Sequence, residues 1–224
     1  MFTQNNFNQW EVIILKRCRH IICFVTVLCL IVIPSTSVQS KRQSTSSITV
    51  PVTPYYQTDP RWGDYLYGNH DPMKKYGCGP TALSIVVSAL TDQTITPPQM
   101  ADWAAEHGYW RLRSGSLHSL IPEGSAAFGL QAEKLYLYTT ESLSEIFEQK
   151  KLIVLLMGSG HFTDSGHFIV LHGIRSDGKV QIADPFSKAH TKQLWDLSLL
   201  KKELSKATDN GGPAWVISNP DSFS

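Results

Sequence analysis

Cysteine is scarce in this sequence of 224 residues, and its distribution is uneven. Three of the four cysteines lie within the first 29 residues, so Cys78 is the only one from residue 44 onward. That part of the chain has no second cysteine with which to close an internal disulfide. The sequence also lacks the CxxC pairs and Cys/His clusters that bind structural zinc, and it has no HExxH motif.

The chain likewise lacks an excess of charge of either sign. Five of the 20 Lys and Arg residues precede residue 44, as does one of the 19 Asp and Glu residues, which leaves 15 against 18 in the remainder. A protein that binds nucleic acid or an anionic membrane surface usually carries a basic stripe, and none is present. The composition therefore argues against nucleic acid as a partner.

The N-terminus follows the pattern of an export signal. Lys16, Arg17 and Arg19 precede residues 21–33, an apolar run that only Thr26 interrupts, and a polar segment follows. We expect residues 1–37 to be an export signal or a signal anchor. The run is shorter than the roughly 20 residues of a comfortable membrane span, and both a cleaved signal and a retained membrane anchor stay open. With either one, we expect the rest of the chain to lie outside the cell, where it is secreted or anchored to the outer face of the plasma membrane.

Residues 38–50 are rich in Ser, Thr and Gln without an apolar period, which predicts a flexible linker. Residues 51–220 show no internal repeat and no second linker, so we expect one domain there. Hydrophobic spacing predicts helices over 80–90, 97–107, 116–128 and 142–149, and strands over 132–138, 152–157, 167–174, 180–184 and 215–218. Helices come first and an antiparallel sheet follows, which is the order of an α+β fold.

Cys78 has the setting of a reactive thiol. It lies between two glycines at the expected N-terminus of the first helix, where the helix dipole favours the thiolate. Main-chain N–H groups at such a turn also suit a developing oxyanion. A small buried residue without chemistry is the alternative reading.

Two residues are candidates to assist the thiol. His167 begins an expected strand and points from its end, whereas His161 and His172 are rival histidines. Asp184 ends the following strand, and a hairpin that turns at Asp177-Gly178, with paired residue numbers summing to about 355, would bring it within reach of His167. A carboxylate there fixes the imidazole tautomer. A hydrogen-bonded core histidine and a turn-forming aspartate are the alternatives.

The short motifs occur in an order that resembles the C39-like peptidase family. They are YYQTDPRW at residues 55–62, YGCGPTAL at 76–83, GSGHF at 158–162, GHFIVL at 166–171 and ADP at 183–185. The resemblance implies a papain-like cysteine peptidase fold, with the cysteine helix packed on an antiparallel sheet that carries the histidine and the aspartate. It implies Cys78 as nucleophile, His167 as general base, Asp184 as orienting residue and Gln57 as oxyanion donor. Family members that process bacteriocins have the glutamine closer to the cysteine, whereas residues 64–75 are inserted here.

Three functions from different classes stay open. The first is an exported cysteine peptidase acting on a peptide or protein substrate, with a cell-wall peptide hydrolase or amidase of the same fold as its variant. The second is a non-catalytic peptide-binding module. The third is a metal hydrolase built on His161, His167 and Asp164, which the missing HExxH motif disfavours. We expect no cofactor.

The export signal makes a direct prediction. Because Lys16, Arg17 and Arg19 favour an N-terminus that stays inside the cell, the domain that follows should lie outside. Protease added to intact cells should digest it together with a known surface protein. A domain that stays protected while the surface protein is cut would contradict the export signal.

Overall fold

The computed structural model describes residues 45–136 and 138–223. The predicted export segment and residues 38–44 of the predicted linker lie outside these ranges. Within them, no helix combines the length and the apolar character that a membrane crossing requires.

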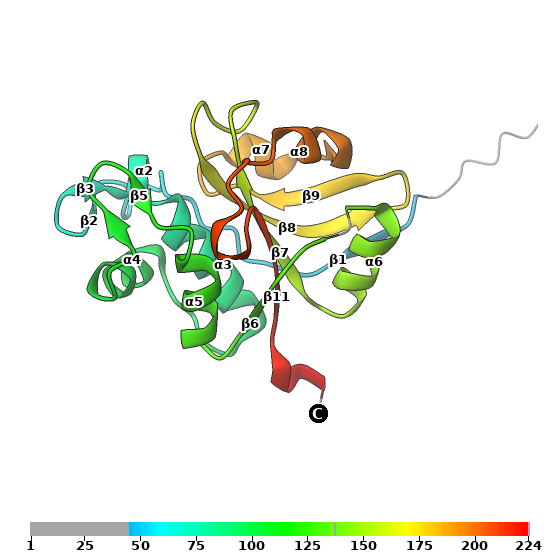
Figure 1. Ribbon diagram of the computed structural model, residues 1–224, viewed down its shortest axis with the longest axis horizontal. Helices are drawn as coiled ribbons and strands as arrows, with labels where there is room; N and C mark the ends of the chain where they lie inside the picture. Colours follow the sequence, from blue (N-terminus) through cyan, green and yellow to red (C-terminus); the bar gives the residue numbers. More distant parts are fainter. Residues whose placement is uncertain (1–44, 137, 224) are drawn as a thin grey trace, which may run out of the picture. The chain divides into compact units, whose positions relative to one another are not determined.

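The described residues form one seven-stranded antiparallel sheet and two short hairpins (Figure 1). The central strands are β7 (Leu152–Met157) and β8 (His167–Arg175), and both are buried along nearly their whole length. Such continuous apolar runs belong to strands that are covered on both faces. The other strands of the sheet are β1 (Ser47–Thr49), β6 (Gln131–Lys134), β9 (Lys179–Ala183), β10 (Trp195–Asp196) and β11 (Ala214–Ser218), in the order β10-β9-β8-β7-β11-β6 with β1 beside β8.

The first described residues differ from the expected linker. Residues 47–49 belong to strand β1 and pair with the last three residues of β8, and Val50 is buried. Strand β7 pairs with residues 167–171 of β8 and β9 takes the other edge, so β1 fills the edge that β7 leaves open. An unpaired strand edge can form backbone hydrogen bonds with any extended segment, including one rich in Ser and Thr. The linker prediction was therefore wrong for residues 47–50.

Helix α3 (Cys78–Leu90) occupies the centre of the fold. It packs against β8, against α4 (Pro97–Glu106) and against α5 (Leu120–Ala127). Residues 79–87 of α3 are all buried, because neighbours surround the helix. Figure 1 shows α3, α4 and α5 gathered with the hairpins β2–β3 and β4–β5, while α6, α7 and α8 lie near the sheet.

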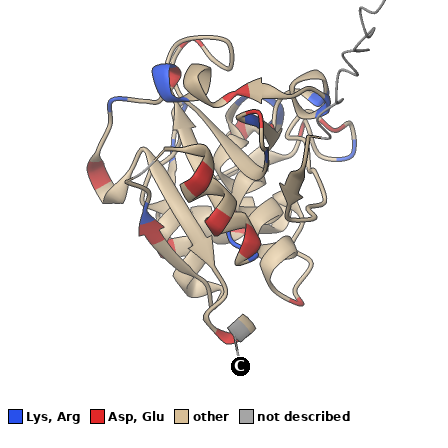
Figure 2. Cartoon of the chain, turned by 90° about the vertical axis from the view of Figure 1, so that its right-hand side faces the viewer, with Lys and Arg blue, Asp and Glu red and all other residues tan. Residues whose placement is uncertain are grey.

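The remaining elements are short. The hairpins are β2 (Leu66–Tyr67) with β3 (Asp71–Pro72), and β4 (Trp110–Arg111) with β5 (Gly115–Ser116). The other helices are α2 (Met73–Tyr76), α6 (Thr140–Glu148), α7 (Lys188–Lys192), α8 (Leu197–Glu203), and the 3-10 turns η1 (Asp209–Gly211) and η2 (Pro220–Phe223). In the view of Figure 2, Lys and Arg residues lie on several separate segments of the chain, and so do Asp and Glu residues.

The structure contains the predicted mixture of helices and antiparallel sheet, with differences at the ends of elements. The helix expected over residues 116–128 begins only at Leu120, because Ser116 pairs with Trp110 in the β4–β5 hairpin. The strand expected over 132–138 is assigned to Gln131–Lys134. Strand β1 and helices α7 and α8 had no prediction at all.

The β8–β9 hairpin turns at the predicted Asp177-Gly178, where Gly178 has a φ of 78°. Its register differs from the expected one. Paired residues sum to 354 near the turn, as in Ile174 with Val180, and to 353 beyond an irregularity at His172, as in Val170 with Ala183. One extra residue on β8 causes this change, in the manner of a β-bulge. The bulge sets how the ends of the two strands meet at the site.

Candidate active site

Cys78 is the first residue of helix α3, which begins two residues before the predicted start at Pro80, and it is partly exposed. The flanking glycines have a packing reason that the sequence did not suggest. A Cβ on Gly77 would lie 2.7 Å from the Met73 carbonyl oxygen, and one on Gly79 would lie 2.5 Å from Ser116 Oγ. Larger residues would therefore push α2 and the β4–β5 hairpin away from the helix start, and with them the thiol.

His167 is the first residue of β8, where it pairs with Met157 of β7. Its ring is buried, with a relative exposure of 6% for the residue. Nε2 lies 2.7 Å from Asp184 Oδ1. A carboxylate only accepts hydrogen bonds, so Nε2 carries the proton and donates it. The other ring nitrogen, Nδ1, is therefore the one that can bond to Cys78.

Asp184 follows the last residue of β9 and is almost completely buried, with a relative exposure of 1%. Besides His167 Nε2, its Oδ1 accepts from the backbone N–H of Phe186 at 2.8 Å and of Ser187 at 3.3 Å. Its Oδ2 accepts from His190 Nδ1 at 2.7 Å. A buried carboxylate is costly unless it is paired, and these four donors compensate for the lost water.

The three side chains influence one another's pKa. Burial alone would raise the pKa of Cys78, but the hydrogen bond to His167 and its charge lower it, together with the backbone N–H groups of Phe168 and Gly79. Burial would lower the pKa of His167, yet the bonds to Asp184 and Cys78 raise it to about 9. Burial would raise the pKa of Asp184, and the His167 bond instead lowers it. All three shifts favour a thiolate, an imidazolium and a carboxylate together.

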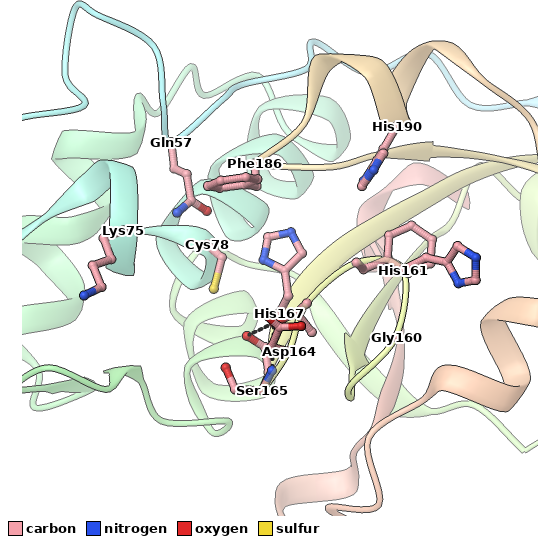
Figure 3. A pocket seen from close by; sticks show the side chains of 13 residues that line it. Gln57, Lys75, Cys78, Gly160, His161, Asp164, Ser165, His167, Phe186 and His190 are labelled. Carbon is pink, nitrogen blue, oxygen red and sulfur yellow. Dashed lines mark hydrogen bonds between the residues drawn. The ribbon is translucent and has the colours of Figure 1, made fainter.

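A cavity of about 450 Å³ opens beside this group. Cys78 and His167 line it, and Asp184 does not, so the carboxylate lies behind the imidazole. Figure 3 shows the Cys78 sulfur and the His167 ring next to each other at the cavity. The loop after β7 supplies residues 160–166 of the wall. The cavity gives a ligand access to the thiol, while the carboxylate stays buried.

Gln57 also lines this cavity, with a relative exposure of only 2%. Its backbone N–H donates to the Pro185 carbonyl at 2.7 Å, which ties it to the chain after Asp184. The inserted residues 64–75 form the β2–β3 hairpin and most of α2, and so bring the chain back to the site. Its Nε2 donates to the carbonyls of Met73 at 3.3 Å and Lys74 at 3.1 Å, while Oε1 has no hydrogen-bond partner.

His161 also lines the cavity, but both rival histidines bond to groups other than Cys78 and Asp184. His161 Nδ1 lies 2.5 Å from Oε1 of the buried Glu203. His172 Nδ1 donates to the Val50 carbonyl at 3.1 Å. Among the described residues, no group of three or more His, Cys, Asp or Glu side chains has an arrangement that could hold a metal ion. Asp164 lines the cavity but forms no such group with His161 and His167.

Sequence reasoning missed His190, which also lines the cavity. A signal for it was present. Ser187 follows the Asp184-Pro185 pair and is a good helix cap, and its Oγ accepts from the His190 backbone N–H at 3.1 Å. A short helix predicted from that serine would have turned residue 190 back toward Asp184.

The protein thus has an α+β fold in which a cysteine at the start of a helix lies next to a histidine at the start of a strand. Residues 49–210 match the model of the Peptidase_C39 like family. The chain belongs to that family, which confirms the resemblance found in the sequence.

Among solved structures, the chain is similar to a double glycine motif protease from an AMS/PCAT transporter, determined in complex with the leader peptide. The identity is 17% and the TM-score 0.44, over 75% of this chain and 91% of that one. No curated protein matches the sequence.

The electrostatics of the site predict how Cys78 reacts with an alkylating reagent. Because the pKa of Cys78 is lowered and that of His167 is raised to about 9, thiolate and imidazolium coexist at neutral pH. Alkylation should therefore stay fast well below the ordinary thiol pKa of about 8.5. His167→Ala should remove this reactivity at low pH, whereas Asp184→Ala should weaken it less. The rate is measured by mass spectrometry of the peptide that contains Cys78.

His161→Ala and His172→Ala are the controls, because these histidines are bonded elsewhere, and both should keep the low-pH reactivity. Circular dichroism confirms that each variant is folded. If His161→Ala abolishes the reactivity and His167→Ala retains it, the general base is His161.

Proposed function

We propose that the protein is an exported cysteine peptidase that hydrolyses peptide or amide bonds with Cys78, His167 and Asp184. The observation that carries the proposal is the continuous polar chain from the Cys78 thiol through the His167 ring to the buried carboxylate, which opens at one end on a cavity. Export rests on residues 16–33 and is tested separately by the protease digestion of intact cells.

The chemistry follows from this arrangement. The Cys78 thiolate attacks the carbonyl carbon of the scissile bond, and the carbonyl π electrons move onto oxygen. The tetrahedral intermediate collapses, the C–N bond breaks, and the His167 imidazolium gives its proton to the leaving amine. A thioester to Cys78 remains. Water then loses a proton to His167 and attacks the thioester, and the thiolate leaves as the carboxylic acid product forms.

Asp184 has an electrostatic role in both halves of the reaction. His167 is charged before the first proton transfer and becomes charged again when it activates water. A fixed carboxylate stabilises that charge and keeps Nε2 protonated, so that Nδ1 faces the sulfur. The pKa of Asp184 is lowered, so the carboxylate stays ionised while His167 cycles.

The intermediate's oxyanion needs donors. We assign this role to the backbone N–H at the start of α3 and to Gln57. The amide of Gln57 lines the cavity near Cys78, and its NH₂ group now donates to two carbonyls of α2 at 3.1 and 3.3 Å. The 3.3 Å bond to Met73 is long for an N–H···O contact, and the 3.1 Å bond to Lys74 lies at the upper end of the usual range. An oxyanion is a stronger acceptor than a peptide carbonyl and would draw one N–H away.

The substrate is a peptide or protein segment that lies in the cavity beside Cys78. Wall peptides are one candidate, since the same steps cleave any accessible amide. A non-catalytic peptide-binding module would not need a thiol with a lowered pKa next to a histidine with a raised one, and this pair favours the peptidase.

Removal of the nucleophile tests the proposal. Cys78→Ala keeps the Cβ and should remain folded, but hydrolysis should fall at least about a thousandfold, because no thioester can form. The assay uses a defined peptide library and purified wall peptides, with product analysis by mass spectrometry. Full activity in the variant would end the nucleophile assignment. Binding of peptides without cleavage by the native protein would favour the non-catalytic module.

Gln57→Ala tests the oxyanion donor. Loss of one such donor costs about 10²- to 10³-fold in kcat, and KM should change much less, because the oxyanion exists only after attack. Steady-state kinetics of the native chain and the variant separate the two constants. An unchanged kcat with a lowered free energy of unfolding would mean that the amide only braces α2.

A further inference from the structure

A second imidazole shares the carboxylate of Asp184. His190, on the short helix α7, has its Nδ1 2.7 Å from Oδ2, while His167 Nε2 lies 2.7 Å from Oδ1. Since an ionised carboxylate only accepts, both ring nitrogens carry protons and donate. Asp184 therefore lies between two histidines. In the view of Figure 3, the His167 ring lies between Cys78 and His190.

The two oxygens of Asp184 differ in their support. Oδ1 accepts from His167 and from the backbone N–H groups of Phe186 and Ser187. For Oδ2, the described residues provide one hydrogen-bond partner, His190. The side chain is 1% exposed, so water does not replace a missing donor. The buried Oδ2 oxygen thus has a single hydrogen-bond donor, the imidazole N–H of His190.

The surrounding structure holds His190 in place independently of Asp184. The hydroxyl of Ser187 accepts from the His190 backbone N–H at 3.1 Å, and Trp195 Nε1 donates to the His190 carbonyl at 3.0 Å. The imidazole packs edge-on against Trp195 and Phe162, with ring centroids 5.2 and 5.6 Å apart. A ring fixed in this way presents its N–H to the carboxylate in one direction.

We infer that His190 is a positioning residue that keeps Asp184 ionised and its Oδ1 turned toward His167. Its part in catalysis rests on the proposed function. Without the His190 donor, Oδ2 is buried and unpaired, which disfavours the charged form of Asp184. A protonated Asp184 no longer stabilises the imidazolium of His167, and the thiolate of Cys78 loses its partner in turn.

Helix α7 carries Lys188 and Lys192 as well as His190. Burial alone would raise the pKa of Asp184; the bond to His167 and its charge lower it most, and the backbone N–H of Phe186 and then the His190 bond lower it further. The other titratable side chains on the cavity wall are Lys75, Cys78, His161 and Asp164. Glu203 is bonded to His161. Since the Asp184 pKa is lowered, its stabilising effect is present at neutral pH and is lost as pH falls.

Three variants of the full chain separate the N–H donor from the ring. His190→Phe keeps a ring of similar shape and removes the donor. His190→Asn removes the ring but retains a donor, because its Nδ2 is attached to Cγ in the same way as the imidazole Nδ1. His107→Phe is the control, since that histidine is exposed and its Nδ1 bonds to the Trp103 carbonyl of helix α4, which ends one residue before it.

The first measurement follows the Asp184 carboxyl by NMR of protein labelled with ¹³C-aspartate, assigned with Asp184→Asn. In His190→Phe we expect the titration midpoint of Asp184 to rise by about one pH unit, a tenfold change in its protonation equilibrium. His190→Asn should stay within about a factor of two of the native chain, and His107→Phe should match it. Equal shifts in the Phe and Asn variants, or none in Phe, would overturn the inference.

The second measurement is the rate of Cys78 alkylation against pH. The acidic limit of fast alkylation should move to higher pH in His190→Phe and return toward the native value in His190→Asn. Hydrolysis of peptides is measured beside it. If the native chain cleaves no peptide while the Asp184 midpoint moves as expected, the proposed function fails and the role of His190 stands. If the native chain cleaves peptides but the Asp184 midpoint does not move in His190→Phe, the proposed function stands and the role of His190 fails.

Discussion

The hydrogen bond between His167 and Asp184 is the constraint on which the site depends. It joins the first residue of β8 to the residue after β9, so the two strands must pair in a register that brings their ends together. The pairing has a turn at Gly178 and one extra residue at His172, and both enter the geometry. Because the carboxylate is buried, a displaced register would leave a charge unpaired at a cost of several kcal/mol.

The thiol is placed by a different kind of constraint, which is close packing around the start of α3. Gly77 fits against Met73, and Gly79 fits against Ser116, at distances that leave no room for a Cβ. The helix therefore cannot slide relative to α2 and the β4–β5 hairpin. Close packing places Cys78 at the start of α3, and the hydrogen bond to Asp184 places His167 at the start of β8. Both residues therefore line the same cavity.

Carboxylates hold histidines twice at this cavity, and the two pairs have different settings. The Asp184–His190 pair adjoins His167, whereas the Glu203–His161 pair ties the loop after β7 to helix α8. A Cβ on Gly160 would lie 2.2 Å from the Glu203 carboxyl carbon, so the glycine is what allows that loop to approach α8.

The sequence by itself determined the α3 helix, the three strands near the site and the turn between β8 and β9. Those predictions rest on local periodicity and on turn residues, which act over a few positions. The family resemblance added Gln57, which no local rule singles out. Only the tertiary structure decided the rest: the pairing of β1 with the edge of β8, the bulge at His172 and the bond from His190 to Asp184. The β1 pairing fills an unpaired strand edge and the His190 bond pairs a buried charge. Such demands arise only after distant segments have packed together.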